Sequence, residues 1–294
     1  MYNLATLLPE KAVWNYSPGM SPIDPTHGLA TARTQRIRAD HLDERLDQVI
    51  EETPVAFVYN GVPFAVMMAT PRDLGDFALG FALAEGIVAS ASEYELLEVL
   101  RGDRGVTLQG MIPAARFEAL QAHRRNLGGR SGCGLCGVEA LEEAVRPLPR
   151  VESTTRITRD AIGAGMQALA RGQVLNRMTG GAHAAAFIAA GEAPLVREDV
   201  GRHNALDKVI GALAATRPSR ETLAAHASTG FAAITSRASW EILHKAAHAG
   251  IAVVAAISAP TSLAIEAAEA SGITLVAFAR KQSMNIYTHA ERVA

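Results

Sequence analysis

The stretch Ile251-Ala-Val-Val-Ala-Ala-Ile257 decides the fold that we predict for this chain. An apolar run with no polar position on either face is typical of a central strand that helices cover on both sides. Predicted strands and helices alternate around it from residue 151 to residue 294, which favours a layered α/β domain with a largely parallel sheet. The expected strands are His183–Ala190, Pro194–Glu198, Phe231–Thr235, Ile251–Ile257 and Ile273–Phe278, and the expected helices are Thr158–Ala170, Arg202–Ala215, Trp240–Ala249 and Ser262–Ser271.

The preceding part of the chain predicts a small α+β domain over residues 46–127. Asn60-Gly61 supplies the two positive φ angles of a type I′ turn, so Val55–Tyr59 and Val62–Ala69 should form a hairpin. Thr70-Pro71-Arg72-Asp73 is typical of a capped helix start, and this helix should end at Gly86. Two strands, Glu95–Leu100 and Val106–Ile112, and a helix, Ala114–Leu127, complete the domain.

The remaining segments are expected to be less regular. Residues 1–45 should form a partly irregular N-terminal arm, because prolines and glycines gather in Ser17–Gly28, and ordered structure should begin at Pro54. Residues 128–150 should form a glycine-rich loop with a short helix, Val138–Val145, and a proline-containing joint to the larger domain.

Composition excludes several classes of function. The chain of 294 residues carries 28 Lys and Arg against 30 Asp and Glu, so it has no global positive field for nucleic acid or an anionic membrane. Its longest apolar stretch, Ile251–Ala259, is about half of the ~20 residues that a membrane-spanning helix needs. No signal peptide is evident at the N-terminus. We therefore expect a cytoplasmic globular protein with no nucleic-acid or membrane partner.

The segment Gly128-Gly-Arg-Ser-Gly-Cys133-Gly-Leu-Cys136-Gly137 contains the chain's two cysteines. The start of the predicted helix after Cys136 and the nearby arginines should favour the thiolate form of these side chains. A thiolate on a glycine-rich segment suits a nucleophile that collects a group, such as sulfane sulfur, at one place and delivers it at another. From spacing alone, metal binding, redox chemistry and a carrier role all stay open.

A metal role for these cysteines is tested by the other ligands that it would require. Zinc needs four ligands, or three and a water molecule, so histidines would have to complete a site that has two thiolates. His183 and His203 are candidates, but neither has a second histidine at a suitable spacing. The catalytic glutamate of a deaminase His-x-Glu motif is replaced by Ala185. We therefore expect no metal.

Polar residues also follow the predicted strands of the larger domain. Thr179-Gly-Gly-Ala-His183, Glu198–Asn204 and Ser236–Ser239 lie at strand–helix transitions and should meet at one edge of the sheet. Ser236–Ser239 is typical of a helix cap, with Arg237 free to meet an anion; each histidine by itself is more often a packing residue. The segment Phe278-Ala279-Arg280-Lys281-Gln282-Ser283 places an aromatic ring and two cations where they could stack on a base and neutralise a diphosphate. The alternative interpretation is that these residues are only the solvent-exposed end of a strand.

Five motifs in this order resemble the FdhD/NarQ family, the formate dehydrogenase accessory sulfurtransferases. The resemblance runs from about residue 46 to residue 289, and Val55–Gly86 looks like the first domain of the same family. The motifs are Gly132-Cys-Gly-Leu-Cys-Gly137, Glu198-Asp-Val-Gly-Arg-His-Asn-Ala-Leu-Asp-Lys208, Ser236-Arg-Ala-Ser239, Ser258-Ala-Pro-Thr-Ser262 and Asn285-Ile-Tyr-Thr288.

This resemblance implies a sulfur carrier with a defined cargo. The protein would take sulfur from a cysteine desulfurase as a persulfide on Cys133, with Cys136 as its partner, and pass it to the bis-molybdopterin guanine dinucleotide form of the molybdenum cofactor before that cofactor enters formate dehydrogenase. Phe278, Ala279, Arg280, Lys281, Gln282 and Ser283 fall on the family's cofactor-binding stretch. The resemblance also implies a cytidine deaminase-like larger domain and a homodimer.

The chain departs from the family in two places. Lys281-Gln282-Ser283 lacks the glycine that is common in the family's loop after the last strand, and His226-Ala-Ser-Thr-Gly-Phe231 is atypical. The main alternative to a sulfurtransferase is a non-catalytic chaperone that binds the molybdenum cofactor for formate dehydrogenase. A zinc-dependent hydrolase is a third hypothesis.

Overall fold

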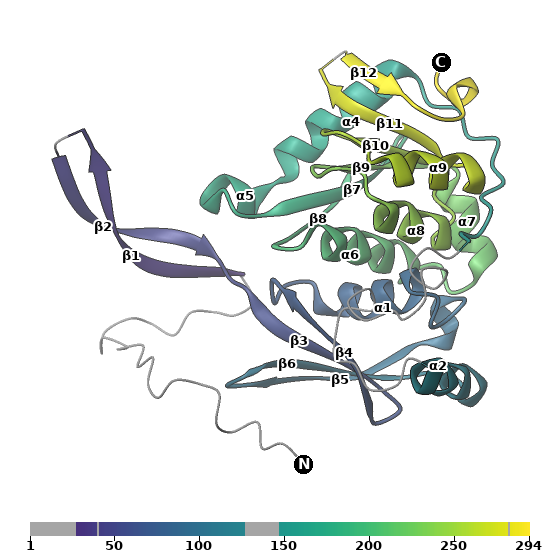
Figure 1. The fold of residues 1–294 in the computed structure, drawn as a ribbon, viewed down its shortest axis with the longest axis horizontal. Helices are drawn as coiled ribbons and strands as arrows, with labels where there is room; N and C mark the ends of the chain where they lie inside the picture. The colour runs from purple at the N-terminus through teal and green to yellow at the C-terminus, as the bar shows by residue number, and fades with distance from the viewer. Residues whose placement is uncertain (1–27, 40, 127–146, 282) are drawn as a thin grey trace.

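A computed structural model describes residues 28–39, 41–126, 147–281 and 283–294. Within these ranges the chain forms three sheets, of two, four and six strands, together with the helices that cover the larger two. Figure 1 shows the layers: helix α4 (Arg159–Gly172), the six-stranded sheet, helices α6 (Arg202–Ala214), α8 (Trp240–His248) and α9 (Ser262–Ser271), helix α1 (Leu74–Ala84), and finally the four-stranded sheet. The two larger sheets therefore share a helical middle, and α1 packs directly on α6.

The small α+β unit confirms the predicted elements over residues 53–126. Its sheet has the order β4-β3-β6-β5, and Asn60 and Gly61 turn the chain between β3 and β4 with φ angles of 49° and 80°, as a type I′ turn requires. Stacked rings of Phe57 and Phe81, with centroids 4.1 Å apart, fix α1 on this sheet. The elements are β3 (Thr53–Tyr59), β4 (Val62–Ala69), α1 (Leu74–Ala84), the short 3-10 helix η2 (Ala91–Glu93), β5 (Glu95–Gly102), β6 (Gly105–Met111) and α2 (Ala114–Asn126).

The predicted cap of α1 is wrong. The helix begins at Leu74 rather than just after Thr70, and the residue before it, Asp73, has a left-handed φ of 52° and makes no side-chain cap hydrogen bond. Thr70 is instead fully buried. Its backbone and hydroxyl groups make hydrogen bonds with Asp199, Val200 and Lys208 of the larger unit. These long-range bonds replace the local capping bond that the sequence pattern predicts.

The larger unit, residues 151–294, confirms the strands and helices that the sequence predicts for it and adds four elements that it does not, α5, α7, β12 and the 3-10 helix η3. They alternate along the chain, as expected for a layered α/β architecture. The elements are α4 (Arg159–Gly172), α5 (Val174–Thr179), β7 (His183–Ala189), β8 (Leu195–Asp199), α6 (Arg202–Ala214), α7 (Arg220–Ala227), β9 (Gly230–Ile234), α8 (Trp240–His248), β10 (Val253–Ala256), α9 (Ser262–Ser271), β11 (Thr274–Arg280), β12 (Ser283–Ile286) and the 3-10 helix η3 (Ala290–Arg292).

The expectation of a largely parallel sheet is wrong. The strand order is β12-β11-β10-β9-β7-β8, and only the central strands β9, β10 and β11 pair in parallel. Short connections make β8 fold back on β7 and β12 fold back on β11, and β7 pairs with β9 in the antiparallel sense. Hydrophobic patterns identify strands, but they do not reveal the direction in which a strand enters the sheet. The resemblance to a cytidine deaminase-like fold stays a prediction.

The two strands before residue 51 correct the prediction that order begins at Pro54. β1 (Leu29–Arg38) and β2 (His41–Ile50) form an antiparallel ribbon that extends away from both larger sheets (Figure 1). Ile37 and Leu42 pair across the ribbon, 72% and 54% exposed, so its outer part is not packed into a core. The predicted boundary between residues 45 and 46 falls inside β2.

Helices α1 and α6 cross backbone against backbone at the seam between the two units. A Cβ atom added to Gly80 of α1 would collide with the carbonyl oxygen of Asp207, and one added to Gly211 of α6 would collide with the carbonyl oxygen of Asp76. Only glycine permits this approach. The seam is therefore tightly packed, and the two units form one body. No helix in the described ranges is both long enough and apolar enough to cross a membrane.

Candidate functional site at the carboxyl edge of the central sheet

The loops that follow the central strands meet at one edge of the six-stranded sheet, as predicted. Because β9, β10 and β11 run parallel, the segments after Ile234, Ala256 and Arg280 leave from the same side. β7 runs the opposite way, so it begins at this edge with His183, which pairs with Asp199 at the end of β8. The predicted convergence of 179–183, 198–204 and 236–239 is thus confirmed.

Backbone hydrogen bonds join two of these loops and the end of β11 into a fixed rim. The Ala238 N–H donates to the Ala259 carbonyl at 3.1 Å, and the Thr261 N–H donates to the Ala238 carbonyl at 3.0 Å. The Phe278 N–H donates to the carbonyl of Ser258 at 3.2 Å. The loops after β9 and β10 and the end of β11 therefore hold one another in place, and side chains on them keep fixed relative positions.

A histidine–carboxylate pair occupies one end of the edge. His203 Nε2 lies 2.9 Å from a Glu241 oxygen, and Arg202 lies 3.8 Å from the same oxygen. The hydrogen bond with His203 is the main reason that the pKa of Glu241 falls to about 2, so this carboxylate stays ionised. Burial, reinforced by the neighbouring Arg202 and His203, lowers the pKa of His183 below its usual value. These contacts support a packing role for His203.

Ser239 takes the N-cap position of α8 without capping it. Its hydroxyl makes no bond to the helix backbone and donates instead to Glu241 at 3.2 Å. The sequence therefore predicts the position correctly and the contact wrongly. The reason is that Glu241, in the first turn of α8, offers a charged acceptor that competes with the backbone.

Phe278 is the most unusual residue of the edge. It has a φ of 52° inside β11, where the register with β12 shifts between Ala277 and Arg280, and 40% of its side chain is exposed. A left-handed backbone costs a non-glycine residue about 1–2 kcal/mol, and such strain gathers at functional sites. Its neighbour Ala279 is buried in the core, so this residue presents almost no surface to a ligand.

The cationic residues that follow Phe278 line a depression between the β11–β12 turn and α4. Arg280, Lys281 and Ser283 line it together with Gln167 of α4. Arg280 Nε donates to the Ile257 carbonyl at 3.1 Å, which directs its side chain along the rim. Gln167 was not predicted from the sequence, because it lies more than a hundred positions before the turn and reaches it only through the packing of α4.

Cys133, Cys136 and Gln282 lie outside the described residues. The same holds for the predicted helix Val138–Val145 and for the irregular part of the N-terminal arm up to residue 27. Their predicted roles stay predictions.

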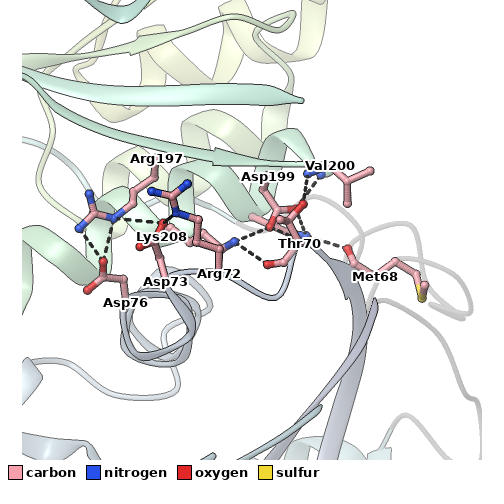
Figure 2. A network of polar contacts seen from close by, with 11 residues as sticks. Met68, Thr70, Arg72, Asp73, Asp76, Arg197, Asp199, Val200 and Lys208 are labelled. Carbon is pink, nitrogen blue, oxygen red and sulfur yellow. Dashed lines mark hydrogen bonds and ion pairs between the residues drawn. The ribbon is translucent and has the colours of Figure 1, made fainter. Parts of the chain in front are cut away.

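Asp199, from the predicted loop motif, organises the seam between the two units rather than the exposed rim (Figure 2). Its carboxylate has no exposed area and lies 2.6 Å from Lys208 Nζ, which is equally buried. The backbone N–H groups of Thr70 and Gly201 donate to it at 3.0 and 2.7 Å, and the Asn204 amide does so at 2.9 Å. Every charge in this cluster is therefore paired and hydrogen-bonded, as a buried ion pair requires.

The turn before α1 is fixed by the same cluster. Lys208 Nζ donates to the Thr70 carbonyl at 2.9 Å, and the Val200 N–H donates to the Thr70 hydroxyl at 3.1 Å. A second ion pair, Arg197 with Asp76 at 2.7 Å, ties β8 to α1 (Figure 2). Glu198 in turn accepts hydrogen bonds from the first backbone N–H groups of α5. The acidic pair 198–199 thus positions the β8–α6 loop whose next residues reach the carboxyl edge.

A second buried lysine, Lys245, connects the two units through ion pairs with two carboxylates. Lys245 of α8 lies 2.9 Å from Asp207 of α6 and 2.7 Å from Glu85 at the end of α1. Both Asp207 oxygens are buried, and neither makes a hydrogen bond of ordinary geometry within the described residues. Burial, only partly offset by Lys245, raises the pKa of Asp207 to about 7.

These features define a class: a two-unit α/β protein whose units are locked together and whose sheet edge presents loops for a ligand. The chain belongs to the FdhD/NarQ family, whose model matches residues 50–294.

Two relatives of this chain have the same name. It is 50% identical over 278 residues to a protein of Xanthomonas euvesicatoria pv. vesicatoria named Sulfur carrier protein FdhD, covering 94% of this chain and 96% of the relative. A protein of the same name from Variovorax paradoxus is 46% identical over 277 residues, with 94% of each chain covered. The crystal structure of a protein described as a formate dehydrogenase accessory protein, from Desulfotalea psychrophila, shares the fold with a TM-score of 0.67 at 24% identity, over 90% of this chain and 99% of that one.

Proposed function

We propose that this chain is a cytoplasmic sulfur carrier that serves the maturation of formate dehydrogenase. It would accept sulfur from a cysteine desulfurase as a persulfide on Cys133 and deliver it to the bis-molybdopterin guanine dinucleotide molybdenum cofactor, its cargo. Membership of the FdhD/NarQ family and the shared name of the relatives support this role. A homodimer is part of the same proposal.

The cofactor-binding part of the proposal rests mainly on Phe278. The backbone of Phe278 has a left-handed φ, and its partly exposed ring lies on a rim that hydrogen bonds make rigid. The exposed cations Arg280 and Lys281 follow it in the chain. Aromatic faces stack on bases and cations neutralise phosphates. A guanine dinucleotide offers both groups.

The sulfur-transfer part follows from thiol chemistry. The thiolate of Cys133 attacks the outer sulfur of the desulfurase persulfide, so that Cys133 gains an S–SH group and the desulfurase regains its thiol. The thiolate of Cys136 then attacks the inner sulfur, a Cys133–Cys136 disulfide forms, and hydrosulfide leaves for the cargo. The two cysteines supply the two electrons that reduce the sulfane sulfur, and an external dithiol restores them.

The test of the carrier role is mass spectrometry of the full chain after incubation with a cysteine desulfurase and cysteine. We expect one added sulfur on Cys133, lost on treatment with a reductant, and none in a Cys133→Ser variant. Absence of the adduct from the unmodified chain would overturn the carrier role.

The main alternative, a chaperone that only binds the cofactor, predicts a different phenotype. The fixed binding rim alone would suffice for such a protein. A Cys133→Ala, Cys136→Ala double variant would then still activate formate dehydrogenase in cells that lack the natural protein. We expect no activation.

A further inference from the structure

We infer that Arg237 binds an anionic group of the ligand, two strands away from Phe278, so that one diphosphate-containing ligand spans the carboxyl edge from the loop after β9 to the end of β11. The inference rests on the proposed function, because the ligand is the proposed nucleotide cargo, and it adds a binding residue that lies outside the stretch 278–283.

The loop that carries Arg237 is fixed on both sides of it. Ala238 is fully buried and Ser236 is 6% exposed, and the Ser236 hydroxyl donates to the Arg237 carbonyl at 3.0 Å. Both backbone groups of Ala238 are bonded to the loop after β10. The guanidinium of Arg237 is therefore presented from an anchored backbone, with less entropy to lose on binding than a side chain on a free loop.

The Arg237 side chain is exposed, and no hydrogen bond or ion pair of its guanidinium is found among the described residues. The carboxylate nearest along the chain, Glu241, is already engaged by His203 and Arg202. The Glu241 carboxylate therefore does not form an ion pair with Arg237. An exposed guanidinium with this geometry is suited to bidentate contact with a phosphate.

The spacing of the rim fits a nucleoside diphosphate. β9 and β11 flank β10, and neighbouring strands lie about 4.8 Å apart, so Arg237 and Phe278 leave the sheet about 10 Å from each other. The loops between them are joined by the bonds Ala238–Ala259 and Ser258–Phe278. A base on Phe278 and a phosphate group near Arg237 are thus held on one continuous rim.

The experiment is calorimetric titration of the full chain with three probes: guanosine diphosphate, guanosine and inorganic pyrophosphate. The variants are Arg237→Ala and, as a matched control, Arg104→Ala, which removes an exposed arginine from the β5–β6 turn of the other unit. Because both side chains are exposed, we expect both variants to fold, and equal melting temperatures would verify it.

We expect Arg237→Ala to weaken guanosine diphosphate about tenfold, the effect of losing one charge-assisted contact of about 1.4 kcal/mol. Binding of guanosine should not change, pyrophosphate should weaken like the diphosphate, and Arg104→Ala should bind all three probes as the unmodified chain does. Equal affinity of Arg237→Ala for the diphosphate, or equal loss in both variants, would overturn the inference.

Failure of the inference is separable from failure of the proposed function. Arg237→Ala should still acquire sulfur on Cys133, since that step does not involve the nucleotide. If the unmodified chain binds the diphosphate but Arg237→Ala binds it equally, only the role of Arg237 is lost. If the unmodified chain binds none of the probes, both the role of Arg237 and the proposed cargo site are wrong.

Discussion

Charged residues are buried and paired at the seam between the two units, whereas they are exposed at the carboxyl edge of the large sheet. At the seam, Asp199 and Lys208 are fully buried and each is hydrogen-bonded to several partners. At the edge, Phe278 is strained and exposed, and Arg237 has no partner in the described part of the chain. The difference shows that the seam uses charged groups to fix the geometry between the two units, whereas the edge leaves Phe278 and Arg237 exposed.

Loss of the buried lysine should have the largest effect on stability. Lys208→Met leaves the Asp199 carboxylate buried without its counter-charge, which typically costs about 3–5 kcal/mol. We expect urea unfolding to show a loss of this size. Lys281→Met, at the exposed edge, should change the free energy of unfolding by less than about 0.5 kcal/mol; equal effects of the two variants would contradict the comparison.

A smaller effect, which depends on pH, should come from replacing the buried carboxylate of Asp207. The pKa of Asp207 is raised to about 7 in the folded chain, above the ~3.9 expected when unfolded, so the proton on Asp207 stabilises the fold at low pH and this contribution is lost as pH rises from about 4 to 7. Asp207→Asn keeps the shape without the charge. Its free energy of unfolding, relative to the unmodified chain, should rise by about 2–4 kcal/mol between pH 5 and pH 8.

Chemical denaturation at several pH values, in one buffer of constant ionic strength, would measure this difference. The charged and titratable groups that surround this site come from several packed elements, namely Lys245, His244 and His248 of α8, Glu85 of α1, Tyr59 of β3, Tyr94 and Asp199. A difference that stays flat from pH 5 to pH 8 would show that Lys245 keeps Asp207 ionised throughout.

The glycine crossing of α1 and α6 should come next in size. Gly80→Ala places a methyl group against the Asp207 carbonyl oxygen, and relief by backbone shifts should cost about 1–3 kcal/mol. Gly75→Ala is the matched control in the same helix, because the nearest atom to its new Cβ is a flexible Leu96 methyl at 3.9 Å. Thermal unfolding should show a loss for the first variant and no loss, or a small gain, for the second.

Replacement of Phe278 at the edge should have a small effect on stability, and with glycine the effect should be a gain instead of a loss. Phe278→Gly removes the cost of a left-handed φ and should stabilise the chain by up to about 1 kcal/mol, offset in part by lost contacts of the ring. Phe278→Ala keeps the strain and removes the ring. Both variants should bind guanosine diphosphate more weakly, and unchanged binding in both would remove Phe278 from the site.

Local signals explain what could be predicted from the sequence. The hairpin at Asn60-Gly61 and the strand around Val253–Ala256 depend on turn chemistry and apolar patterning within a few residues, and both were correct. The ribbon β1–β2 was missed because one face of β1 mixes Leu29 and Ile37 with polar residues, so no clear alternation marks it as a strand.

Long-range contacts account for what was missed at the site. Thr70 and Asp199 are 129 positions apart, yet their hydrogen bond decides how the chain enters α1. The stretch Glu198–Asn204 is predicted to lie at the edge of the sheet, but the structure places the carboxylate of Asp199, with its partner Lys208, at the seam. A lysine in a helix of buried apolar residues is the signal that could have revealed this, since such a charge needs a buried partner.

The crossing of Gly80 and Gly211 has a consequence for attempts to dissect the molecule. A gene divided near residue 147 would yield two fragments, each with one half of a seam made for direct backbone contact, and would separate Arg197 from its ion-pair partner Asp76. Neither fragment should be stable when expressed by itself, whereas production of both in one cell should allow them to reassemble. Fragment complementation is therefore a practical route to labelling one half of the molecule at a time.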